Sequence, residues 1–159
     1  MRYLLAILCF ALLLPVTTSL TATAATTEEV TALVELTAKA MEKNALQTLA
    51  RINRAEHPYM DKDNAALYIF VFDPDLTLVA HAVKTKLIGL NMRGKPDVKG
   101  KKFRDEFLTV TRQSGSGWVD YYFDNPKSKK VEHKTSFVKL VKGSDGKEYI
   151  IGCGKYYDD

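Results

Sequence analysis

The fold of this chain is decided by residues 117–137, GWVDYYFDNPKSKKVEHKTSF, together with residues 149–157, YIIGCGKYY. The alternating residues and the Asn-Pro pair predict two antiparallel strands joined by a tight basic turn, and the second stretch predicts a closing strand. The first strand is rich in aromatic residues, and the second carries Lys134. An apolar wall that excludes water and a nearby ammonium group are what a pocket needs to hold a small organic anion.

Alternation along the first strand divides its aromatic residues between two faces. Trp118 and Tyr122 share one face, while Tyr121 and Phe123 share the other. We expect the pocket to use Trp118 and Tyr122 and the core to take the other pair. Lys134 is the leading candidate for ligand contact, because a buried ammonium needs an anionic partner. A solvated lysine on an edge strand is the alternative.

Two further strands are predicted upstream. Residues 65–72, AALYIFVF, are apolar on both faces, as in a central strand that is covered on both sides, and residues 76–83 form the return strand of a hairpin. His81 on this return strand either donates a hydrogen bond to a carboxylate or is a strand histidine satisfied within the protein. Residues 84–100 are predicted to form an irregular loop, and residues 103–113 a short helix.

A long helix is predicted at the start of the domain. Thr26 and Glu29 fit a capping box, and the apolar residues that follow recur at steps of three and four. Pro58 disfavours helix at His57, so we expect the helix to end near His57. Such a helix is about 45 Å long at 1.5 Å per residue, more than a small core can cover. One end is therefore expected to project or to pack on a second copy of the chain.

These elements predict an α+β domain. Short turns between successive strands make neighbouring strands antiparallel, which gives a sheet of about five strands. The long helix is expected to cover one face of the sheet. Residues 84–113 are then expected to cover the other face, with a pocket beneath them.

The N-terminal region reads as a secretory signal. Arg2 precedes an apolar run at residues 3–14, and a small-residue pattern predicts cleavage after Ala24, which leaves a single domain at residues 25–159. An uncleaved anchor is the alternative, but the run is short for a span of about 20 residues. Cleavage leaves Cys153 as the only cysteine, and its apolar surroundings predict a buried, inert thiol.

Several stretches together resemble the single Cache domains, type 2: residues 65–83, 87–91, 97–107, 117–141 and 148–157. The resemblance covers about residues 28–157 and is most specific in GWVDYYF-NP-K and IGCGKYY. It implies a PAS-like extracellular sensor domain that binds small carboxylates on the sheet face opposite the long helix. It also implies that the ligand pocket is lined by His81, Trp118, Tyr122 and Lys134, with Tyr68 or Phe70 as its floor. Arg93 in the loop is a further candidate, because its guanidinium can clamp a carboxylate with two hydrogen bonds.

Other classes of function find no support in the sequence. The net charge of +4 is modest, and no nucleic-acid-reading motif is present. The three histidines lack metal-ligand spacing, and no catalytic triad, phosphate-binding glycine loop or haem attachment motif occurs. We therefore expect neither an enzyme nor a bound cofactor or metal. The basic residues between 95 and 104 are interpreted as a solvated face: Lys95, Lys99, Lys101, Lys102 and Arg104.

The leading hypothesis is an exported domain that binds a small carboxylate. Because no transmitter region is recognised, it is expected to act through a partner in trans, such as a membrane-bound receptor or kinase, or to act as a ligand buffer. The alternative is a non-binding Cache-like scaffold or interaction protein that assembles through its long helix. A homodimer through this N-terminal helix is a further expectation. An exported enzyme with a cryptic site is the third hypothesis.

Overall fold

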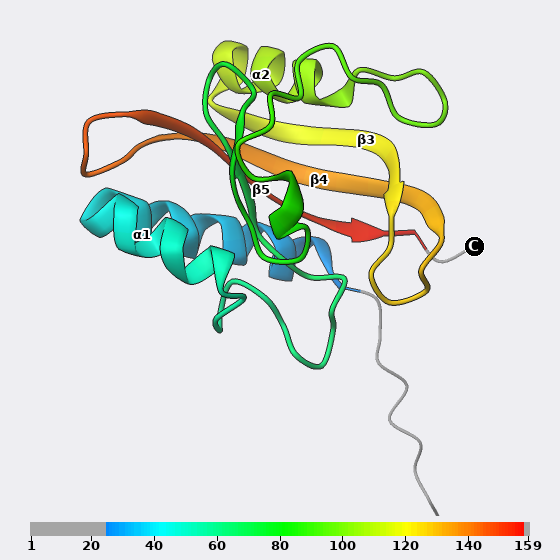
Figure 1. Cartoon of the computed structure of the whole chain (residues 1–159), viewed down its shortest axis with the longest axis horizontal. Coiled ribbons are helices and arrows are strands. Elements are labelled where there is room, and N and C mark those ends of the chain that lie inside the picture. The colour runs from blue at the N-terminus through cyan, green and yellow to red at the C-terminus, as the bar shows by residue number, and fades with distance from the viewer. Residues whose placement is uncertain (1–24, 158–159) are drawn as a thin grey trace, which may run out of the picture.

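The computed structural model describes residues 25–157 and confirms the α+β architecture (Figure 1). The predicted signal peptide and its cleavage after Ala24 lie outside the described residues. A five-stranded antiparallel sheet has the order β2-β1-β5-β4-β3. Its strands are β1 (Phe70–Phe72), β2 (Leu78–His81), β3 (Ser116–Asp124), β4 (Val131–Lys142) and β5 (Glu148–Tyr156). Figure 1 shows the sheet between two helical layers, with α1 on one face and α2 on the other.

Helix α1 (Thr27–Asn53) begins as predicted but ends earlier than predicted. The Thr26 hydroxyl accepts a hydrogen bond from the amide of Glu29, and the Glu29 carboxylate accepts one from the amide of Thr26. The helix stops at Asn53 and not near His57, because Ala55 takes a left-handed conformation with φ of 53°. The Asn53 side chain then accepts a hydrogen bond from the amide of His81 at 3.0 Å, which ties the helix end to β2.

Helix α1 is broken at Asn44, which the apolar periodicity did not predict. Asn44 has φ of −156° and ψ of 89°. The turn between β4 and β5 fills the break, since Ser144 Oγ accepts from the amide of Ala45 at 2.9 Å. The amide of Ser144 in turn donates to the carbonyl of Met41 at 3.0 Å. Tertiary contact with the hairpin thus replaces helical hydrogen bonds at this point.

The first two strands are shorter than the predicted ranges 65–72 and 76–83. The chain before β1 bonds elsewhere, with the amide of Ile69 donating to the carbonyl of Tyr59 at 2.9 Å. Leu76 has a positive φ of 63° and belongs to the turn. Strand β2 ends at His81, because the His81 ring accepts the amides of the following residues and turns the chain.

Residues 84–114 cover the face of the sheet opposite α1, as predicted. They include the 3₁₀ helix η1 (Thr85–Leu87), an irregular loop and helix α2 (Phe103–Ser114). Helix α2 approaches β3 closely at Gly117, where a Cβ atom would lie 2.4 Å from Val110 Cγ1. The predicted cavity beneath this layer is present.

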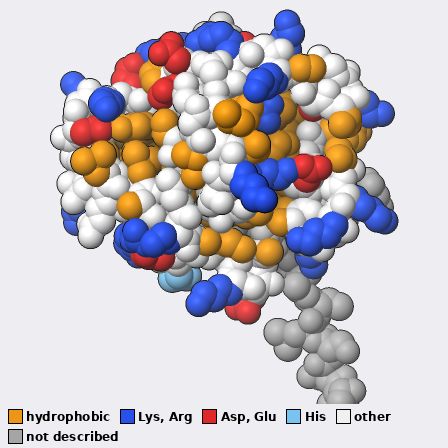
Figure 2. Space-filling model, in the orientation of Figure 1, with side chains coloured by type: hydrophobic (Ala, Val, Ile, Leu, Met, Phe, Trp, Pro, Cys, Tyr) orange, Lys and Arg blue, Asp and Glu red, His pale blue; other side chains and the backbone are white. Residues whose placement is uncertain are grey.

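The surface carries no single dominant charge in the view of Figure 2, where lysine and arginine side chains are scattered among acidic and apolar ones. Within residues 25–157, no helix is both long enough and apolar enough to span a membrane.

Candidate ligand-binding site

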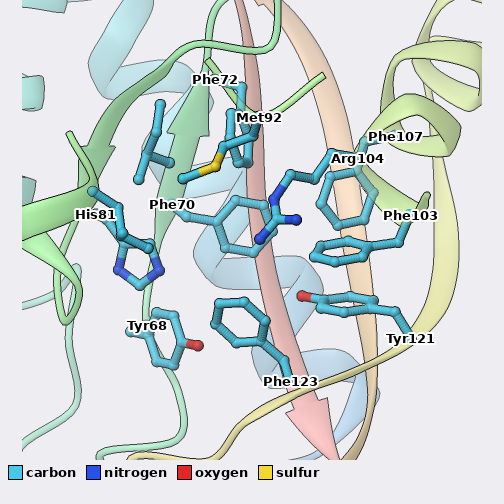
Figure 3. Close-up of a pocket in the computed structure, with 12 residues that line it drawn as sticks. Tyr68, Phe70, Phe72, His81, Met92, Phe103, Arg104, Phe107, Tyr121 and Phe123 are labelled. Atoms are coloured by element: carbon cyan, nitrogen blue, oxygen red, sulfur yellow. The ribbon is translucent and has the colours of Figure 1, made fainter. Parts of the chain in front are cut away.

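A cavity lies between the sheet and the layer formed by η1, the loop and α2. Its internal volume is about 20 Å³, room for roughly one water molecule. Apolar side chains form most of the wall, and polar groups from three elements reach into it (Figure 3). The lining residues are Tyr68, Phe70, Phe72, Leu78, His81, Leu87, Met92, Phe103, Arg104, Phe107, Tyr121 and Phe123.

Arg104, in the first turn of α2, supplies the positive charge of the cavity. Its side chain is buried and its guanidinium points into the cavity (Figure 3). The guanidinium carbon lies 4.1 Å from the centre of the Phe103 ring, and Nη1 donates a long hydrogen bond of 3.4 Å to the carbonyl of Lys95. No carboxylate pairs with Arg104 among the described residues. Burial lowers the pKa of Arg104, so an anion in the cavity would stabilise the charged form.

The interpretation of residues 95–104 as a solvated face is therefore wrong for Arg104. Together with Phe107 and Thr111, Arg104 forms the inward face of α2 at positions i, i+3 and i+7. A cation on the apolar stripe of an amphipathic helix is the signal that could have identified it. The run of basic residues does not reveal that Arg104 is buried, because its neighbours Lys99 and Lys102 are exposed.

His81, at the end of β2, is a neutral hydrogen-bond donor. Its Nδ1 accepts hydrogen bonds from the amides of Val83 at 3.1 Å and Lys84 at 2.9 Å. The proton of the neutral ring is therefore on Nε2. Burial, followed by the positive charges of Lys134 and other nearby side chains, lowers the pKa of His81 to about 3, so the ring stays uncharged at neutral pH.

Lys134, in β4, is fully buried, which removes the alternative of a solvated edge lysine. Its Nζ donates to the hydroxyl of Tyr68 at 2.8 Å and to that of Tyr156 at 3.5 Å. Burial lowers the pKa of Lys134 to about 7. Lys134 does not itself line the cavity, but Tyr68 does, so the Tyr68 hydroxyl connects the ammonium with the cavity. Burial also raises the pKa of Tyr68, which keeps its hydroxyl protonated.

Two glycines of the IGCG sequence in β5 make room on the sheet for these side chains. A Cβ atom at Gly152 would lie 2.2 Å from Phe70 Cζ. One at Gly154 would lie 2.2 Å from Ser136 Oγ, 2.4 Å from the carbonyl oxygen of Thr135 and 2.7 Å from Lys134 Cε. Cys153 is fully buried, as predicted, and burial raises the pKa of its thiol to about 12. The two glycines of IGCG therefore leave the space over β5 that the Phe70 and Lys134 side chains occupy.

The predicted facing of β3 is wrong. Tyr121 and Phe123 line the cavity, whereas Trp118 and Tyr122, which alternate with them along β3, do not. Tyr122 instead lines a solvent-open hollow beside β3. The cause is the packing of α2, because the Phe103 ring stacks on Tyr121 with ring centres 4.0 Å apart. Trp118, 37% exposed, packs on Phe137, and Tyr122 stacks on His133.

Of the remaining predicted residues, three line the cavity and Arg93 does not. Tyr68 and Phe70 line the cavity together with His81. Arg93 does not, because its side chain is exposed, donates to the carbonyl of Pro74 at 3.2 Å and lies 3.9 Å from the Asp75 carboxylate. Within residues 25–157, no group of three or more histidine, cysteine, aspartate or glutamate side chains is arranged to hold a metal ion.

Comparison with known proteins gives consistent matches. The family model described as "Single Cache domain 2" matches residues 16–159. The methyl-accepting chemotaxis protein McpP of Pseudomonas putida is 27% identical over 124 residues, which are 78% of this chain but 21% of McpP. The chain thus spans about a fifth of the length of this relative.

Solved structures with the same fold were also found. A periplasmic sensor domain of a chemotaxis protein is 27% identical, with a TM-score of 0.63 and coverage of 82% of this chain and 90% of the other. A methyl-accepting chemotaxis protein from Vibrio parahaemolyticus has a TM-score of 0.67 at 16% identity, with coverage of 83% and 88%. A Cache chemosensory domain, described in terms of carboxylic acid recognition, has a TM-score of 0.66 at 21% identity, with coverage of 82% and 92%.

Proposed function

Because the chain belongs to the single Cache domain 2 family, we propose that it is a non-enzymatic sensory domain that binds a small carboxylate in the cavity beneath α2. The resemblance seen in the sequence is thereby confirmed. The observation that carries the proposal is Arg104, a buried guanidinium that faces an aromatic cavity and has no carboxylate partner among the described residues. A ligand carboxylate would supply the missing negative charge.

The donors around the cavity define how the carboxylate is held. The guanidinium of Arg104 offers a planar fork, and the Nε2–H of His81 offers a neutral donor. The Tyr68 hydroxyl accepts a hydrogen bond from Lys134 and lies 3.3 Å from the Tyr156 hydroxyl, which itself donates to the carbonyl of Asp124. Tyr68 offers a third donor to the ligand when its proton turns from Tyr156 to the carboxylate. The carboxylate therefore belongs between Arg104, His81 and Tyr68, with Lys134 acting through Tyr68.

The rest of the cavity favours a short apolar tail on the ligand. Phe72 and Met92 lie at the end away from Tyr68 (Figure 3), and Leu78 pairs with Phe72 across β1 and β2. Among the described residues, Arg104 is the single charged side chain that lines the cavity, so a second carboxylate would find no cation of its own. Since the free volume is about 20 Å³, side chains must move even for a short monocarboxylate to enter. Propionate-like acids fit this arrangement better than dicarboxylates or amino acids.

The biological setting is proposed from the relatives. Sensor domains of chemotaxis proteins are periplasmic in one matched structure, and the predicted signal peptide agrees with export of this chain. The proposed partner is a membrane-bound receptor or kinase that responds to the occupied domain. Pairing of two copies through α1 is also proposed, because Leu36 and Leu46 of this helix are 47% and 69% exposed.

Titration calorimetry tests the binding proposal. The purified protein is titrated with acetate, propionate, pyruvate, lactate, succinate and amino acids, and hits are checked by thermal shift. The variant Arg104→Gln should weaken binding by at least about tenfold, since a hydrogen bond to a charged group contributes roughly 1.5–3 kcal/mol. The matched control Arg93→Gln removes an exposed arginine and should bind like the wild type. Binding that survives Arg104→Gln, or the absence of any carboxylate hit, contradicts the proposal.

A further inference from the structure

A second hollow lies directly outside the buried cavity. It opens to solvent between β3 and the loop at residues 96–98, and its volume is about 260 Å³. Three residues line both this hollow and the cavity: Phe103, Arg104 and Phe123. Their side chains therefore form the wall between the two spaces.

The rim of the hollow is fixed by one carboxylate. Asp97 Oδ2 accepts from the amide of Tyr122 at 2.9 Å, which ties the loop to β3. Asp97 Oδ1 accepts from the amides of Lys99 and Lys101, each at 2.9 Å, which holds the loop in shape. Val98 and Val131 line the hollow and are 68% and 43% exposed. The hollow is thus preformed and open to solvent.

Of the three wall residues, Phe103 is held by its stack on Tyr121, and Phe123 has the weaker contacts. Phe123 is half-buried and touches its aromatic neighbours edge-on, with ring centres 6.1 Å from Phe103 and 6.0 Å from Tyr121. The ammonium of Lys84 lies 4.6 Å from the centre of the Phe123 ring. Arg104, also part of the wall, has a single long hydrogen bond of 3.4 Å and packs on the Phe103 ring, not closely on Phe123. Turning Phe123 aside therefore breaks few strong interactions.

We propose that this hollow is the entrance to the cavity, and that Phe123 is the gate residue that also limits the length of the ligand. The proposal rests on the proposed function for the nature of the ligand. An incoming carboxylate meets Arg104 from the hollow and keeps this contact after it has passed Phe123. Removing the Phe123 ring joins the cavity to the hollow, so a monocarboxylate whose tail is too long for the end at Phe72 and Met92 fits by turning its tail into the hollow.

The first test measures access to the cavity without any ligand. Leu78 lines the cavity and is 1% exposed, so a cysteine placed there by Leu78→Cys is alkylated by iodoacetamide only when the cavity opens. Adding Phe123→Ala should speed this alkylation roughly tenfold, because the loss of about one aromatic contact lowers the free-energy barrier to opening by the amount that corresponds to this rate change. The control is Leu87→Ala, which thins the cavity wall at η1, away from the hollow. Peptide mass spectrometry separates this adduct from any on the buried Cys153. Faster alkylation with Leu87→Ala but not with Phe123→Ala overturns the proposal.

A second measurement leaves the wall intact, in case Phe123→Ala does not fold. A bulky maleimide adduct on Val131→Cys, at the rim, should slow the association of propionate by at least about tenfold, as expected when a step requires an open path. The control adduct on Lys127→Cys lies in the exposed turn that precedes Val131, outside the hollow, and should change nothing. Unchanged association with the Val131→Cys adduct places the entrance elsewhere.

The ligand preference completes the test. Phe123→Ala should improve the affinity for hexanoate relative to propionate, whereas an unchanged ratio refutes the role of Phe123 in limiting length. A wild-type protein that binds no carboxylate contradicts the proposed function, but the alkylation of Leu78→Cys still decides where the entrance lies.

Discussion

Burial of Lys134 predicts an unusual dependence of stability on pH. The pKa of the amine falls from 10.5 to about 7 because the side chain is buried. Between these values the unfolded chain holds one more proton than the folded protein, so the free energy of unfolding rises with pH across this window. At about 1.36 kcal/mol per pKa unit, the gain between pH 7 and pH 10.5 is about 5 kcal/mol.

The assay compares the wild type with Lys134→Met, which keeps the length of the side chain and removes the charge. Urea unfolding is followed by circular dichroism at pH values from 6 to 10.5, and the difference between the two proteins cancels the titration of the tyrosines and exposed lysines. Relative to the variant, the wild type should gain stability as the pH rises from about 7 to 10.5 and stay level below about pH 7. A difference that stays constant within about 1 kcal/mol, or falls with pH, refutes the account of Lys134 as a buried amine.

Three further predictions concern the site and the helix break. Gly154→Ala should destabilise the protein by about 1–3 kcal/mol in urea unfolding, because the added methyl meets Ser136 Oγ and the carbonyl of Thr135 as well as the Lys134 side chain; equal stability would show that the sheet adapts. Ser144→Ala should cost about 1 kcal/mol by the same measure, since the amide of Ala45 loses its acceptor, and a neutral effect would mean that water replaces it. Carboxylate affinity should fall as the pH rises above about 7, where Lys134 loses its proton, and calorimetry should find this fall in His81→Gln but not in Lys134→Met. A fall found in Lys134→Met but not in His81→Gln would show that His81 is the group that titrates.

Local patterns predicted the elements of this fold well, because each depends on neighbours in the sequence. The alternation in β3 and the turn after it determined a strand pair, and the capping residues Thr26 and Glu29 marked the start of α1. Alternation defines two faces but cannot say which of them meets α2. That choice depends on distant contacts such as the stack of Phe103 on Tyr121, and it reversed the roles of Trp118 and Tyr122.

The sequence indicated residues of the candidate site where a charged or polar side chain has few possible hydrogen-bond or charge partners. His81 stood out because it lies in an apolar strand, and Lys134 because it lies opposite the aromatic strand β3; both are buried. Arg104 was missed because its position follows from the orientation of α2, whereas its neighbours in the sequence suggest a solvated surface. Arg93, chosen for its chemistry alone, lies outside the cavity, since its loop faces the turn at Pro74.

The break in α1 has a mechanical consequence. The helix consists of two rods, about 25 Å and 13 Å long at 1.5 Å per residue, which are joined through the hairpin at Ser144. A twist of the first rod therefore does not pass along a continuous hydrogen-bonded ladder to the second. It reaches the hairpin first, and β4 and β5 lead from there to Lys134 and Tyr156. The sheet, through Ser144, thus provides a second connection between the two halves of the longest helix.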